Sequence, residues 1–131
     1  MHTPAAHAPA LTATYPGDAQ HIRAVRADLR TVLGDYPRAD DAILCASELA
    51  ANAALHSHSR LSGSTFTVRA ITSLGLYTRI EVRDDGGPWN QAMVDPARHH
   101  GLDIVRAVAD EWGIDGDQTG RTIWARFDWP E

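Results

Sequence analysis

The fold of this chain is decided by the stretch ELAANAALH, residues 48–56, in the middle of a long apolar run. At 100° per residue on a helix, Glu48, Asn52 and His56 are four residues apart and share one face. Between residues 42 and 57 Glu48 is the only fully charged residue, and alanine is the most frequent of the others. A carboxylate and an amide on an otherwise buried helix are costly unless something satisfies them. The function therefore depends on what this polar face meets.

Length and composition indicate one domain with its own core. The chain has 131 residues, of which 44 % are hydrophobic. No apolar run approaches the roughly 20 residues that span a bilayer, so we expect no membrane contact. The first ten residues, MHTPAAHAPA, lack the basic and apolar regions of a secretory signal, and we expect residues 1–10 to be disordered. The single cysteine, Cys45, excludes an internal disulfide and is expected to be a small buried hydrophobe, which favours a cytoplasmic location.

Charge and histidine placement argue against two further classes of function. The net charge is −5, lysine is absent, and the twelve arginines are scattered. A nucleic-acid surface usually needs a concentrated basic patch, so we expect no nucleic-acid partner. The histidine pairs at 56/58 and 99/100 lack a third partner at a usual ligand spacing, which argues against a structural zinc site.

The pattern of apolar residues predicts strands and helices in a single domain over residues 11–131. Asp18 suits the N-cap of the first helix, and Gly34 is expected to end it. We expect strands over residues 11–15, 65–72, 76–83, 112–114 and 121–129, and helices over residues 18–33 and 40–58 and from near Gly101. The economical fold class is an α/β two-layer sandwich (α+β), with a mixed, largely antiparallel sheet and three helices on one face.

Three further motifs could contribute to a site with the helix of residues 40–58. Asp84-x-Gly86 follows a strand, where the carboxylate can accept a hydrogen bond from an exocyclic amine and the glycine lets a flat ring approach; the same pair also suits a plain turn. Gly101 opens a helix with free N–H groups, which is a generic anion site or a bare helix start. Gly120-Arg121-Thr122 enters the last strand, where a hydroxyl can donate to a phosphate or a ring nitrogen, or is simply a strand residue.

Taken together and in order, these motifs resemble those of the GHKL (Bergerat-fold) ATPase superfamily. The stretch Glu48-Leu49-x-x-Asn52-Ala53-x-x-His56 is similar to its N-box, and Val82-Arg83-Asp84-Asp85-Gly86 to its adenine-binding box. Gly101-Leu102-x-Ile104-Val105 resembles the second glycine box, and Gly120-x-Thr122-Ile123-Trp124-Ala125 the closing strand. The resemblance covers roughly residues 11–128. Within the superfamily it is strongest to the small bacterial anti-sigma-factor serine kinases.

The resemblance implies a function for the polar face of the second helix. Asn52 would coordinate Mg²⁺, which in turn holds the phosphates of ATP. Glu48, one turn earlier, would act as the general base on the attacking hydroxyl. These roles agree with the preference of Mg²⁺ for a few protein oxygens together with phosphates and waters.

The resemblance also implies residues that bind the nucleotide. Asp84 would bind the adenine amino group, and Gly86 would give the ring room. Gly101 and Leu102 would offer backbone N–H groups to phosphate. Thr122 would support adenine recognition through Asp84 or a water.

Two features leave alternatives open. The family usually has glycine two residues before Gly101, where this chain has His99. A histidine there could crowd the phosphate loop, donate to a phosphate, or mark weak nucleotide binding. His56 matches the N-box, and both a phosphate contact and a packed, hydrogen-bonded histidine fit its position.

The implied activity is an ATP- and Mg²⁺-dependent serine/threonine protein kinase that regulates transcription by partner switching. Such a protein would bind a sigma factor and phosphorylate an anti-anti-sigma (STAS-type) partner, and the resemblance suggests a homodimer. The alternative is a non-catalytic regulatory protein-binding module of the same fold, with weak or no nucleotide binding.

Overall fold

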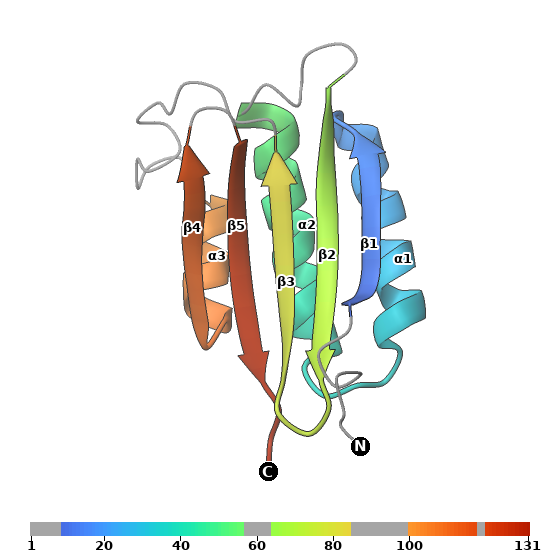
Figure 1. Cartoon of the computed structure of the whole chain (residues 1–131), viewed down its shortest axis with the longest axis vertical. Coiled ribbons are helices and arrows are strands. Elements are labelled where there is room, and N and C mark those ends of the chain that lie inside the picture. The colour runs from blue at the N-terminus through green and yellow to red at the C-terminus, as the bar shows by residue number, and fades with distance from the viewer. Residues whose placement is uncertain (1–8, 57–63, 85–99, 118–119) are drawn as a thin grey trace, which may run out of the picture.

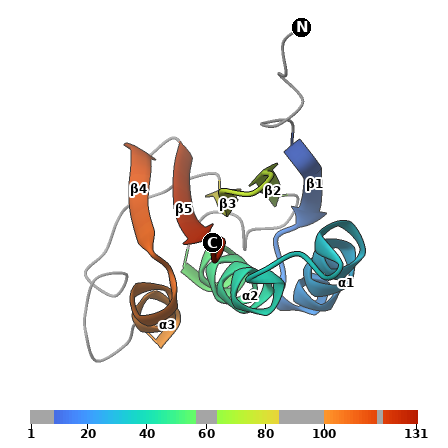
Figure 2. The ribbon, with the colours of Figure 1, turned by 90° about the horizontal axis from the view of Figure 1, so that it is seen from below.

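The computed structural model describes residues 9–56, 64–84, 100–117 and 120–131 as a two-layer sandwich. Figure 1 views the sheet face-on, and Figure 2 shows α1, α2 and α3 together on one face of it. Predictions for Gly86 and His99 and for residues 1–8 and 57–58 fall outside the described residues. The elements, in chain order, are β1 (Pro9–Pro16), the 3-10 helix η2 (Ala19–His21), α1 (Ile22–Leu33), α2 (Ala39–His56), β2 (Thr65–Ser73), β3 (Tyr77–Asp84), α3 (His100–Val108), β4 (Glu111–Asp117) and β5 (Gly120–Asp128).

The sheet confirms the predicted fold class but corrects its mixed character. Its strand order is β1-β2-β3-β5-β4, and each of the four neighbouring pairs is antiparallel. β4 and β5 follow each other closely in sequence, and so short a connection permits only an antiparallel hairpin. The same holds for β2 and β3, whose turn contains Gly75 with a φ of +82°.

Local sequence signals set the limits of α1 much as predicted. The Asp18 side chain accepts a hydrogen bond from the Gln20 amide at 3.1 Å, which caps the first turn. That turn is a 3-10 helix, so the α-helix itself begins at Ile22. Gly34 follows the last residue with a φ of +51°, a conformation that glycine adopts without steric cost. Val25, Leu29 and Leu33 form the buried face.

The core lies between α2 and the central strands. The side chains that α2 contributes to it are mostly small alanines. Ala42, Ala46 and Ala50 are fully buried, and α2 contacts α1, α3, β2, β3 and β5. Small side chains let a helix axis approach a sheet closely, because nothing longer than a methyl group separates them. The sheet contributes the larger core side chains, which include Phe66, Val68, Ile80, Val82, Ile123 and Phe127.

Arg38 fixes the first turn of α2 to two other elements. Its backbone has a φ of +66°, which is uncommon for a residue with a side chain. Its guanidinium donates to Asp41 at 2.7 Å, to Asp110 at 2.7 Å, and to the carbonyl oxygens of Val108 and Asp128 at 2.9 Å and 3.0 Å. The end of α3 and the end of β5 are therefore tied to the start of α2.

Cys45 is fully buried, as predicted, and burial raises the pKa of its thiol to about 12. None of the described helices has the length and apolar character needed to cross a membrane.

We predict that Ala50→Leu destabilises the fold, because added methylenes at a fully buried alanine force α2 away from the sheet. The expected loss in the free energy of unfolding is about 1–3 kcal/mol. Urea denaturation measures it, with Ala27→Leu as the matched control at an exposed position of α1. Equal stability of the two variants would contradict close packing of α2 on the sheet.

Candidate functional site

One end of the sandwich gathers the segments that carry the predicted site. β3 ends there, β5 begins there, and the last turns of α2 lie behind them (Figure 1). Asp84 pairs with Arg121 across β3 and β5, and α2 contacts both strands. The fold therefore brings the last turns of α2 and the end of β3 to the same end of the molecule.

Glu48 and Asn52 lie on one face of α2, one turn apart, as predicted. Both side chains are half-buried, whereas Leu49 and Ala53 beside them are buried in the core. This places a carboxylate and an amide at the boundary between the helix layer and solvent. At such a boundary, the carboxylate oxygens of Glu48 and the amide oxygen of Asn52 are partly desolvated but can still be reached by a ligand. His56 belongs to α2, and its side chain is outside the described residues.

Asp84 ends β3 with its side chain on the helix-facing side of the sheet. Its exposed fraction is 5 %, and the neighbouring Arg121 side chain is 1 % exposed. Arg121 Nε lies 4.0 Å from Asp84 Oδ1, so the two groups form a buried ion pair. Burial lowers the pKa of Arg121, and the charge of Asp84 opposes that shift.

Arg121 is the residue that sequence reasoning missed. The signal was present, because Ile123, Ala125 and Phe127 alternate toward the core and residue 121 has the same parity. An arginine at a core-facing position of a strand is uncommon unless its charge is paired. The motif therefore contributes a guanidinium to the site, in the place where a hydroxyl was expected.

Thr122 is a correction to the predicted site. It pairs with Arg83 and is half-buried on the sheet face that bears no helices. There it lines a cavity of about 220 Å³ with Thr67, Arg69, Glu81 and Arg83. Successive strand residues point to opposite faces, so the Thr122 hydroxyl is on the wrong side of the sheet to support Asp84.

The start of α3 carries the two residues predicted to offer backbone N–H groups to phosphate. Gly101 is the second residue of the helix, and Leu102 is the third. The Leu102 side chain is 4 % exposed and belongs to the hydrophobic core, so the amide is the group that Leu102 can offer to a ligand. The first N–H groups of a helix have no partner within the helix and suit an anion.

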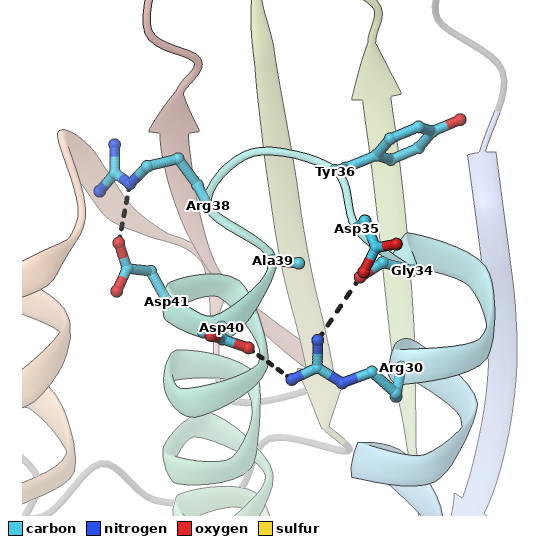
Figure 3. Close-up of a pocket in the computed structure, with 8 residues that line it drawn as sticks. All are labelled: Arg30, Gly34, Asp35, Tyr36, Arg38, Ala39, Asp40 and Asp41. Carbon is cyan, nitrogen blue, oxygen red and sulfur yellow. Dashed lines mark hydrogen bonds and ion pairs between the residues drawn. The ribbon is translucent and has the colours of Figure 1, made fainter.

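A second cavity, of about 410 Å³, lies at the opposite end of α2 (Figure 3). Four of the charged side chains that line it form ion pairs, Arg30 with Asp40 at 2.6 Å and Arg38 with Asp41 at 2.7 Å. Asp40 and Asn52 are twelve residues apart on the same helix, which is roughly 18 Å along its axis. This cavity is therefore separate from the predicted site. Within the ranges that the structure describes, no group of three metal-ligating side chains occurs.

Comparison with known proteins identifies the class. Residues 15–127 match the family model described as a histidine kinase-like ATPase domain. The match covers most of the chain, which therefore belongs to this family and is an ATPase domain of the GHKL type. The resemblance inferred from the sequence motifs is thereby confirmed at the level of the superfamily.

One solved structure with this fold is described as the crystal structure of the RsbU and RsbW domains of Rv1364c from Mycobacterium tuberculosis. The TM-score is 0.65 at 24 % sequence identity, and the match covers 94 % of this chain and 33 % of that chain. The present chain thus spans about a third of that protein's length, and the similarity concerns the fold. A comparison with curated proteins gives no significant match.

We predict that Asp84→Asn destabilises the protein, because it leaves the buried Arg121 charge without its carboxylate. The expected loss is about 3–5 kcal/mol in the free energy of unfolding. The double variant Asp84→Asn/Arg121→Met should recover most of that loss, since it removes both charges. Urea unfolding of the wild type and the variants measures the effect, and a fully stable single variant would contradict the ion pair.

Proposed function

We propose that this protein is an ATP- and Mg²⁺-dependent serine/threonine protein kinase of the anti-sigma-factor type. The observation that carries the proposal is the half-buried polar face of α2 with Glu48 and Asn52, in a domain of the histidine kinase-like ATPase family whose α2 contacts β3, the strand that ends at Asp84. The fold similarity to a structure that includes an RsbW domain is consistent with it.

The donor chemistry of the site fits a magnesium nucleotide. Asn52 offers an amide oxygen, and Mg²⁺ typically takes one or two protein ligands together with phosphates and waters. A cluster of three protein ligands is therefore not required. When bound, the metal would neutralise charge on the phosphates and orient them.

Asp84 would accept a hydrogen bond from the exocyclic amine of adenine, and Gly86 would leave room for the ring. The backbone amides of Gly101 and Leu102 would donate to phosphate oxygens at the start of α3. Together these groups would hold the adenine and the phosphates of ATP. Thr122 has no part in this assignment, because its side chain lies on the other face of the sheet.

Glu48 is assigned as the general base. The hydroxyl oxygen of a substrate serine attacks the γ-phosphorus, and its proton passes to the Glu48 carboxylate. The bond between the γ-phosphorus and the oxygen that bridges to the β-phosphate breaks, and ADP leaves. Phosphoryl transfer depends mainly on positioning and charge neutralisation, and a half-buried carboxylate one turn from Asn52 suits that requirement.

The proposed partners follow from the sequence resemblance. They are a sigma factor, which the protein would hold inactive, and an anti-anti-sigma (STAS-type) protein, which it would phosphorylate. We further propose a cytoplasmic location and a homodimer.

A second candidate is a non-catalytic protein-binding module of the same fold. The buried Arg121 favours it, because a guanidinium beside Asp84 competes with an adenine amine for the same carboxylate. Isothermal titration calorimetry with ATP and Mg²⁺ separates the two candidates. Measurable binding supports the kinase, and its absence favours the module.

We predict that Glu48→Gln abolishes phosphoryl transfer while ATP binding is retained, because the amide cannot accept the proton. Asn52→Ala should weaken binding of the magnesium nucleotide, because it removes the metal ligand. Transfer from labelled ATP to a STAS-type partner protein measures the first effect, and calorimetry measures the second.

The matched control is Glu111→Gln, an exposed glutamate on β4 that pairs with Arg126. It should leave transfer unchanged. Wild-type transfer rates in Glu48→Gln would rule out the assignment of the base.

A further inference from the structure

We propose that the outer face of the sheet, the face opposite α1, α2 and α3, carries a binding site for a phosphate group. The site is the cavity of about 220 Å³ lined by Thr67, Arg69, Glu81, Arg83 and Thr122. Its ligand is a phosphate dianion, either free in solution or carried by a phosphoserine side chain. Because the sheet separates this cavity from α2, the site does not require the proposed binding of ATP at Glu48 and Asn52.

The strand register sets three of these side chains in one row across the sheet. Arg83 of β3 pairs with Thr67 of β2 on one side and with Thr122 of β5 on the other. Directly paired residues of neighbouring strands point to the same face of a sheet, so the Arg83 side chain stands between two hydroxyl groups. Guanidinium and hydroxyl groups can donate hydrogen bonds, and phosphate oxygens accept them. The row therefore offers donors from three strands to one cavity.

Positive charge exceeds negative charge around the cavity. Among the residues that the structure describes, Glu81 is the one carboxylate that lines it, and it accepts from Arg69 Nη1 at 3.2 Å and from Arg79 Nε at 2.9 Å. Two guanidinium groups thus share one carboxylate, and Arg83 adds a third positive charge. These four side chains carry three positive charges and one negative charge, a net charge of +2, in a chain whose net charge is −5. A phosphate group of about −1.5 to −2 at pH 7 balances that excess.

Arg83 is the arginine of this face whose charge is left for a ligand. Three other arginines on the face form ion pairs with carboxylates, namely Arg69, Arg79 and Arg126. Arg83 is exposed and forms no ion pair within the described ranges of the chain. Its guanidinium lies against the backbone of Gly120, where an added Cβ would come to 3.0 Å from Arg83 Cζ. The group therefore rests on the start of β5, and its N–H groups are available to an anion.

An ordinary charged surface makes a different prediction. Exposed arginines attract anions weakly, and salt screens that attraction. Arg23 provides the comparison, because it is an exposed arginine on α1, in the other layer of the sandwich. If the outer face binds nothing specifically, Arg83 and Arg23 will respond alike to added phosphate.

The test is a titration of the ¹⁵N-labelled wild-type protein with inorganic phosphate, followed by nuclear magnetic resonance at constant ionic strength. The pH is about 8, above the second pKa of a phosphate group. A second titration uses acetyl-Gly-phosphoserine-Gly-amide, and a third uses the same peptide without the phosphate. We expect saturable shift changes at Thr67, Arg83 and Thr122 with both phosphate ligands and none with the unphosphorylated peptide. Tighter binding of the phosphopeptide would assign the site to phosphoserine, and equal affinities would assign it to free phosphate.

The variant Arg83→Gln should weaken phosphate binding about 10–100-fold, the range for loss of a hydrogen bond to a charged group. Arg23→Gln is the matched control, because it removes the same charge from an exposed position, and it should bind phosphate as the wild type does. Shift changes that do not saturate, or equal losses in the two variants, would overturn the proposal. Because the wild-type titration is followed at individual residues, it tests the site even if Arg83→Gln fails to fold.

Discussion

The close contact between the alanine face of α2 and the central strands is the constraint on which the rest of the structure depends. Ala42, Ala46 and Ala50 are fully buried against a sheet that supplies the larger core side chains. The helix contacts both β3 and β5. Glu48 and Asn52 lie on α2 as half-buried groups. The same packing that builds the core therefore places polar groups at the boundary of the two layers.

The two ends of α2 are assigned different roles in the proposed function. At the first turn, Arg38 joins α2 to the ends of α3 and β5 through a dense set of hydrogen bonds. Near its last turns the helix carries the groups assigned to the nucleotide. The cavity lined by Arg30 and Asp40 belongs to the first end, where charges satisfy one another. The charged residues that form ion pairs are thus at the first end of the helix, and Glu48, which is assigned to the nucleotide site, lies further along it.

The sequence predicted most of the fold, since apolar periodicity marked most element ends to within about two residues and the motif order indicated the superfamily. The exceptions are α1, which begins at Ile22 after a 3-10 turn, and β4, which extends to Asp117. The sequence pattern was wrong on mixed strand pairing, because strand direction depends on which strands become neighbours. It did not predict Arg121 as a site residue, because the resemblance assigns that role to the hydroxyl of Thr122 in the same motif. Adjacent residues of a strand point to opposite faces of the sheet, so only one of Arg121 and Thr122 can be on the same face as Asp84. The pairing of Asp84 with Arg121 in the β3–β5 register shows that this residue is Arg121. Burial of the guanidinium is a tertiary property that composition does not reveal.

The central claim is that a magnesium nucleotide binds where β3, β5 and the last turns of α2 meet. Nuclear magnetic resonance of the ¹⁵N-labelled protein, titrated with ATP and Mg²⁺, tests it most directly. The account predicts the largest amide shift changes at Asn52, Asp84 and Arg121, with Arg30 and Asp40 at the opposite end unchanged. Changes centred on the Arg30–Asp40 cavity, or no saturable change anywhere, would contradict it.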